Sequence, residues 1–254
     1  ATDIPFALCQ AIFHTLFNLH LLAIGLTAEH VGVLQSSAAW IMAAIAIPIG
    51  LVGDRFGRRG MFVTGSLIFA APYLVLPWLT DFRLVVVVYA VCTVGNALMM
   101  VNEAPILAGE VNSDQRASVF SFMMVNFFLW NTLGSTLAGI LADRLPQTGN
   151  SPYSWPLVLA GVFGLGAGVT RAFLRFKPQP KPVGRQSFSL KLNRTTLILL
   201  VLALLSGAFN ALFMNFGNVI LAERFAFETA TISTVLTAAG VVGFMGSLMV
   251  PWTS

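Results

Sequence analysis

The sequence predicts an all-α, polytopic membrane helix bundle, and three observations carry this prediction. Of the 254 residues, 57% are hydrophobic and only 9% are charged, whereas soluble proteins carry about 25% charged residues. Apolar runs long enough to cross a bilayer, about 20 residues each, recur along the chain. Short segments with turn residues or charges separate these runs. A soluble domain could not hydrate its surface with so few charges, but lipid covers most of the exterior of a membrane protein.

Taken in order, eight apolar runs are candidate membrane spans. They cover residues 4–26, 31–52, 61–79, 84–107, 117–142, 155–176, 195–221 and 230–250. Lys and Arg gather in the segments that follow even-numbered spans, where Arg171 and Arg175 are interpreted as snorkelling from a helix end. The positive-inside rule then places these segments and the N-terminus in the cytoplasm. We therefore expect an integral, multi-pass protein of the plasma membrane.

Residues 177–194 are predicted to link two bundles. This segment is basic and contains Pro178, Pro180 and Pro182, and a Pro-rich chain is extended and semi-rigid. A plain solvated loop is the alternative. The expected organisation is a six-helix N-terminal bundle over residues 1–176, this cytoplasmic linker, and the start of a C-terminal bundle over residues 195–254.

Polar side chains are unevenly distributed among the predicted spans. They are costly inside a membrane and usually face a bundle interior or water. Spans 1, 4, 5 and 7 contain several, while spans 3 and 6 contain no Asn, Gln, His, Asp or Glu. We expect the first group to line a wet cavity and spans 3 and 6 to face lipid. The candidate cavity residues are Gln10, His14, Asn18, Asn96, Asn126, Trp130, Asn131 and Asn210.

Each of these candidates has a structural alternative. His14 and the asparagines could join helices by hydrogen bonds, and Trp130 could simply pack. Glu103 is the candidate proton carrier, because an ionisable group inside a span marks a functional site by default. Glu103 lies near the predicted cytoplasmic end of span 4, so a structural pairing with a loop arginine is its alternative.

The densest charge cluster of the chain lies between spans 2 and 3, in residues 50–60. Its candidate functional residues are Gly50, Gly53, Asp54, Arg55, Gly57, Arg58 and Arg59. The glycines permit a tight turn and a close approach of helices. Asp54 could accept hydrogen bonds from a helix N-terminus and from arginine, which would form a latch on the cytoplasmic side. The alternative is that the arginines only set the topology.

The chain also contains an internal echo of this cluster. Residues 50–55, at the end of span 2, resemble residues 139–144, at the end of span 5. These are the second helices of two successive three-span units, and the two helices end on opposite faces of the membrane. An inverted three-plus-three helix repeat produces this relation.

The pattern Gly-x-x-x-Asp-Arg-x-Gly-Arg-Arg between spans 2 and 3 resembles the signature loop of the major facilitator superfamily. Glu110 and Arg116 are similar to the acid-and-arginine pattern that follows span 4 in that family. The resemblance implies two six-span bundles that rock around a midplane site. Because the family pattern has twelve spans, we expect further spans beyond Ser254.

Two departures narrow the resemblance. Drug–proton antiporters of the family carry an arginine four residues before a glycine in span 4, where this chain has Val91 before Gly95. They also carry a Gly-Pro…Gly-Gly pattern in span 5, which residues 134–139 lack. Both differences argue against a typical multidrug–proton antiporter.

The expected function is that of a secondary active transporter, which moves a small organic solute by alternating access with proton coupling as an option. A uniporter and a non-transporting receptor or scaffold are the alternatives. No catalytic, nucleotide-binding or metal-binding pattern occurs in the sequence, so no enzymatic activity, cofactor or metal is predicted. The expected partners are the lipid bilayer, a small-molecule substrate and, with coupling, protons. Nucleic acid binding is not expected, and a monomer is.

Overall fold

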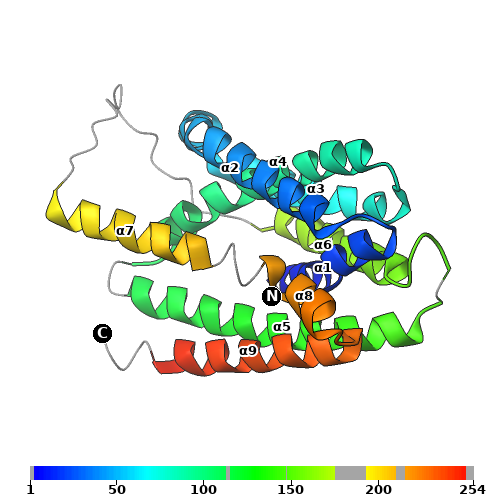
Figure 1. The fold of residues 1–254 in the computed structure, drawn as a ribbon. Coiled ribbons are helices and arrows are strands. Elements are labelled where there is room, and N and C mark those ends of the chain that lie inside the picture. Colours follow the sequence, from blue (N-terminus) through cyan, green and yellow to red (C-terminus); the bar gives the residue numbers. More distant parts are fainter. Residues whose placement is uncertain (1–2, 113–114, 147, 175–192, 210–214, 250–254) are drawn as a thin grey trace.

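The computed structural model describes residues 3–112, 115–146, 148–174, 193–209 and 215–249, and within these ranges the regular structure is entirely helical (Figure 1). Six described segments are long and apolar enough to cross a membrane, which confirms the predicted all-α membrane bundle. The helices are α1 (Asp3–Ala23), α2 (Ala28–Phe56), α3 (Arg58–Ala70), α4 (Phe82–Glu110), α5 (Arg116–Arg144), α6 (Ser154–Ala172), α7 (Arg194–Phe209), α8 (Asn215–Phe225) and α9 (Thr229–Met249).

The helix boundaries follow from local capping chemistry. Thr27 caps α2 in a capping box: its side chain accepts a hydrogen bond from the backbone N–H of His30, and the Nδ1 atom of His30 accepts one from the Thr27 N–H. Asp81 caps α4 by accepting from the Arg83 N–H at 2.8 Å. Gly57, with φ of 102°, separates α2 from α3. We call the bundle end with Asp3 and Gly57 the Gly57 end, and the other the Thr27 end.

The third and seventh predicted spans differ in detail from the structure. The α-helix of the third span ends at Ala70, and two 3₁₀ turns, η1 (Ala71–Leu74) and η2 (Leu76–Trp78), complete the crossing. Pro72 and Pro77 explain this change, because proline lacks the N–H group that an α-helical hydrogen bond requires. The seventh span corresponds to α7 and α8, and residues 210–214 between them lie outside the described residues, as do residues 177–192 of the predicted linker.

The packing of the first six helices repeats itself. Helix α1 packs on α5 and α6, α4 packs on α2 and α3, and α3 packs on α6. Exchanging α1 with α4, α2 with α5 and α3 with α6 leaves this set of contacts unchanged. The α1–α5 contact becomes α4–α2, the α1–α6 contact becomes α4–α3, and the α3–α6 contact maps onto itself. Two inverted three-helix units give this relation.

Glycines bring several helices into backbone contact. A Cβ atom on Gly65 of α3 would lie 2.7 Å from the backbone N of Met99, and one on Gly95 of α4 would lie 2.8 Å from the Cα of Phe69. These glycines therefore let α3 and α4 touch without an intervening side chain. Helix α6 uses Gly164 in the same way, because a Cβ atom there would lie 2.7 Å from the Cβ of Ala70.

The expectation that spans 3 and 6 face lipid holds for only one face of α6. Val162 and Val169 are exposed, while Leu157, Ala160 and Ala167 are buried where α6 packs on α1 and α3. The amino-acid composition of a span does not distinguish these faces, because apolar side chains suit both lipid and a helix interface.

Helices α8 and α9 pack on the first six. Helix α9 lies along α5 and α8 packs on α1, as Figure 1 shows. Thr136 and Thr237 share a hydrogen bond of 2.9 Å between α5 and α9, and Tyr153 and Thr229 share one of 2.8 Å near the Thr27 end.

Candidate functional site

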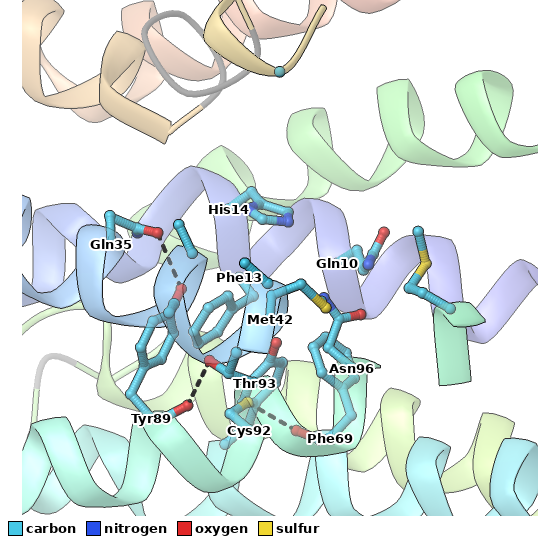
Figure 2. Close-up of a pocket in the computed structure, with 16 residues that line it drawn as sticks. Gln10, Phe13, His14, Gln35, Met42, Phe69, Tyr89, Cys92, Thr93 and Asn96 are labelled. Atoms are coloured by element: carbon cyan, nitrogen blue, oxygen red, sulfur yellow. Dashed lines mark hydrogen bonds between the residues drawn. The ribbon is translucent and has the colours of Figure 1, made fainter. Parts of the chain in front are cut away.

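A cavity of about 640 Å³ lies between α1, α2 and α4. Phe69 and Tyr73, from α3 and η1, close one side of it, and Gly207 of α7 reaches another. Figure 2 shows side chains from these helices converging on the same space. The volume falls within the range of pockets that hold a small organic molecule.

The polar part of the cavity wall combines neutral hydrogen-bonding groups with one histidine. Gln10 and His14 come from α1, Gln35 from α2, and Thr93 and Asn96 from α4 (Figure 2). The Oδ1 atom of Asn96 is buried and has no hydrogen-bond partner among the described residues. A buried carbonyl oxygen without a partner is costly, so this atom is a ready acceptor for a solute.

Stacked aromatic rings form the apolar wall. Phe13 stacks on Tyr73 with ring centroids 3.9 Å apart and on Phe17 with centroids 4.3 Å apart. Tyr89 stacks on Phe17 at 5.3 Å, and Phe69 meets Tyr73 edge-on at 5.0 Å. These contacts hold the rings in one orientation, so the cavity offers a firm, flat surface.

The structure brings together three of the predicted cavity residues, which are Gln10, His14 and Asn96. Asn18 is buried between helices and donates a hydrogen bond to the Oδ1 atom of Asn218 at 3.1 Å. On α5, the Trp130 Nε1–H donates to the Oδ1 atom of Asn126 at 3.2 Å. The remaining predicted residues are Asn131, which is half-buried on α5, and Asn210, which lies outside the described residues.

The predicted set lacks three polar side chains of the cavity wall, which are Gln35, Tyr89 and Thr93. Gln35 and Tyr89 line the cavity and share a hydrogen bond of 3.2 Å. Gln35 carried a usable signal, since an amide inside an apolar span is the same feature that selected Gln10 and Asn96. Tyr89 carried none, because tyrosine occurs equally in cores and at membrane interfaces.

The glycine-rich cluster joins α2 to α3 and α4, and joins α3 to α6. Asp54 forms an ion pair with Arg58 across the α2–α3 turn, and Arg59 donates to the carbonyl oxygen of Ala172 in α6 at 2.9 Å. A Cβ atom on Gly53 would lie 3.4 Å from the Cγ of Asn102 in α4, so glycine permits this approach. The other members of the cluster lie in the same turn: Gly50 is near Val101, Gly57 forms the break, and Arg55 stacks on Phe56.

Arg171 corrects an expectation from the sequence, because its side chain does not snorkel. The residue is fully buried, and its guanidinium lies 4.4 Å from the ring centroid of Phe6 and 4.7 Å from that of Phe62. It donates to the Oγ atom of Ser66 at 2.9 Å and to Asp3 Oδ1 at 3.3 Å. Apolar rings and one carboxylate compensate its burial more effectively than a route to the membrane surface.

Glu103 belongs to the surroundings of this buried arginine. Its carboxyl group is half-buried near the Gly57 end of α4 and interacts electrostatically with Arg171 and Asp3. Asp3 forms the ion pair with Arg171, and the Glu103 carboxyl group adds to the negative charge in its surroundings. The sequence anticipated a loop arginine as the partner of Glu103, whereas this arginine lies within a membrane helix.

Comparison with known proteins agrees with this architecture. The family model of the Major Facilitator Superfamily matches residues 5–254. The chain belongs to the major facilitator superfamily. As a member with several apolar helices long enough to cross a membrane, it is an integral, multi-pass membrane protein.

A distant relative is the "Probable anion transporter 3, chloroplastic" of Arabidopsis thaliana. It is 24% identical over 195 residues, which cover 70% of this chain and 37% of the relative. The chain thus spans little more than a third of that relative's length.

Proposed function

We propose that this major facilitator protein is a secondary active transporter of a small organic solute and that the cavity between α1, α2 and α4 binds this solute. The unpartnered Oδ1 atom of Asn96 in the cavity wall is the observation that carries the proposal. A non-transporting receptor or scaffold has no need to maintain a buried, unpaired acceptor beside an open space, because such an atom destabilises the fold.

The cavity wall supports a specific solute chemistry. Asn96 requires a hydrogen-bond donor on the solute, and the aromatic side chains of Phe13, Tyr73 and Tyr89 add an apolar wall. Among the described lining residues, His14 is the one that can carry positive charge. We therefore propose a small, polar solute with an N–H or O–H group and a flat or apolar part. Because the Arabidopsis relative is named as an anion transporter, anions enter the test as a competing solute class.

The proposed mechanism is alternating access. The first six helices form one moving unit, residues 177–194 link it to the second, and α7 to α9 begin that second unit. The cluster of Asp54, Arg58 and Arg59 latches the Gly57 end. We propose that this end and the N-terminus lie on the cytoplasmic side of the plasma membrane. The positive-inside distribution of Lys and Arg supports this orientation.

Proton coupling forms the second part of the proposal, with Glu103 as the carrier. Glu103 is half-buried and lies in the electrostatic surroundings of the Arg171–Asp3 pair. Binding a proton at Glu103 removes one of the two negative charges facing that arginine. This change strengthens the relative hold of Arg171 on Asp3 and couples proton binding to the contact between α1 and α6.

The experiment is transport into vesicles. The purified full-length protein is reconstituted and supplied with a panel of labelled neutral solutes, organic anions and inorganic phosphate under an imposed pH gradient. Accumulation that a protonophore abolishes is the expected result. Equilibration without accumulation identifies a uniporter instead. The absence of both flux and solute-dependent thermal stabilisation across the panel identifies a receptor or scaffold and overturns the proposal.

A further inference from the structure

Four polar side chains on four helices form one continuous chain of hydrogen bonds. The Tyr89 hydroxyl of α4 donates to Gln35 Oε1 of α2 at 3.2 Å. The Gln35 Nε2 group donates to Asn18 Oδ1 of α1 at 3.4 Å, and the Asn18 Nδ2 group donates to Asn218 Oδ1 of α8 at 3.1 Å. Every link runs in the same direction, so each hydrogen bond polarises the next.

One end of this chain ties α8 to α1. The Nδ2 group of Asn218 donates to the backbone carbonyls of His14 at 3.0 Å and Thr15 at 3.1 Å. Asn18 and Asn218 are only 4% and 2% exposed. Hydrogen bonds in such a dry setting are stronger than those at a surface, and breaking one leaves a costly unpaired group.

The other end of the chain lies in the cavity. Tyr89 and Gln35 both line it, and Figure 2 shows their hydrogen bond beside His14. The Gln35 amide uses its oxygen toward Tyr89 and its nitrogen toward Asn18. Because the amide keeps a second N–H and a second lone pair, a solute competes with a link when its hydrogen bond turns the amide away from Tyr89 or Asn18.

We propose that Gln35 is a positioning residue for transport, which transmits occupancy of the cavity to the contact between α1 and α8. A solute bound at Gln35 draws the amide away from Asn18, Asn18 in turn loosens its hold on Asn218, and α8 separates from α1. The inference rests on the proposed transport function. It assigns the solute a neutral hydrogen-bonding group that faces α2, in addition to the donor that Asn96 requires.

The test measures the separation of α1 and α8 without any solute. Spin labels are placed at the exposed positions Ala23 on α1 and Arg224 on α8, in a background with Cys9→Ala and Cys92→Ala. Tyr89→Phe, which keeps the ring, and Gln35→Leu are expected to add a longer-distance population to the short-distance population of the parent protein. Thr136→Val is the matched control. It removes the hydrogen bond between α5 and α9, two helices that are far apart in sequence, and this bond is not connected to the four-residue hydrogen-bond chain.

A double substitution tests whether the four residues act as one unit. If they do, the double variant Tyr89→Phe/Asn218→Ala has the same long-distance population as Asn218→Ala alone. If the sites are independent, the effects of the two substitutions on this population add. Unchanged distances in Tyr89→Phe and Gln35→Leu, or an equal change in Thr136→Val, overturn the inference. Because the measurement needs no solute, a failure of the transport proposal shows separately, as missing flux across the whole solute panel.

Discussion

Arg171 of α6 and Asp3 of α1 form a partly buried ion pair, with the Arg171 Nη2 atom 3.3 Å from the Asp3 Oδ1 atom. The arginine side chain is completely buried and that of Asp3 is 36% exposed. The pair joins the first and last helices of the predicted N-terminal bundle, and the rings of Phe6 and Phe62 flank its cation.

Arg171→Ala should strongly destabilise the protein. The substitution leaves a cavity between two rings, and a large-to-small change in a core costs about 2–5 kcal/mol. Loss of the pair itself adds little, because the remaining Asp3 side chain is 36% exposed and can be hydrated. Thermal unfolding in detergent measures the effect. Arg171→Lys should recover only part of the loss, since lysine lacks the planar group that stacks on rings. Arg224→Ala, at an exposed arginine, serves as the control, and an equal loss there would contradict the assignment.

Asp54→Asn should slow transport without unfolding the protein. The ion pair of Asp54 with Arg58 is part-exposed, with side chains 31% and 18% exposed, so its contribution to stability is small. If the pair contributes about 1 kcal/mol to the rate-limiting rearrangement, its loss slows transport about fivefold. Initial rates in vesicles check this, with Arg83→Gln, at an exposed arginine outside the cluster, as the control. Wild-type rates for Asp54→Asn would show that the cluster sets topology alone.

Glu103→Gln should separate accumulation from exchange. Glutamine retains the size and hydrogen bonding of the side chain but cannot carry a proton. Uphill accumulation driven by a pH gradient should therefore disappear, while exchange of labelled for unlabelled solute continues at a similar rate. Glu110→Gln, at the C-terminal residue of the same helix, is the comparison. Undiminished accumulation in Glu103→Gln would remove Glu103 from the coupling mechanism.

Asn96→Leu should raise stability and weaken solute binding together. Leucine removes a buried oxygen that lacks a partner, and relief of such a penalty is worth about 1 kcal/mol. The same change removes the proposed acceptor for the solute, so KM for transport should rise. The unfolding temperature and the transport kinetics, measured on one preparation, give the change in stability and the change in KM. A lower unfolding temperature would mean that Asn96 has a structural role instead.

Gly95→Ala should disturb the contact of α4 with α3. The new Cβ atom would lie 2.7 Å from the backbone C of Ile68 and 2.8 Å from the Cα of Phe69, and backbone cannot move aside as a side chain can. Overpacking of this kind costs about 1–3 kcal/mol. Gly60→Ala is the matched control, because a Cβ atom there has nothing within 4 Å. Equal unfolding temperatures for the two variants would refute this packing.

The fold was largely predictable, because membrane spans follow from local composition. Breaks at Thr27 and Asp81 were expected, and both residues cap helices. The third span could not be predicted in detail, since Pro72 and Pro77 are tolerated in membrane helices as often as they end them. Arg171 was misinterpreted because a cation near a helix end usually reaches the surface, and only the tertiary arrangement of Phe6, Phe62 and Asp3 reverses that preference.

The candidate site was partly predictable. Amides inside spans pointed to Gln10 and Asn96, and the structure places both in the cavity wall. The same rule selected Asn18, whose partner Asn218 is 200 residues away in sequence. A pattern in one helix cannot distinguish a hydrogen bond to a solute from one to a distant helix, because both need the same side chain on the same face.

The repeated packing of α1 to α6 has a consequence for directionality. A unit whose contacts map onto themselves when it is turned upside down has no built-in preference for either side of the membrane. The bias between import and export must then come from features that lack a counterpart in the other half-unit. Arg171 with Asp3 is one such feature, and the chain from Tyr89 to Asn218 is another. Altering these asymmetric elements, rather than the shared framework, is the way to change which side of the membrane the resting protein faces.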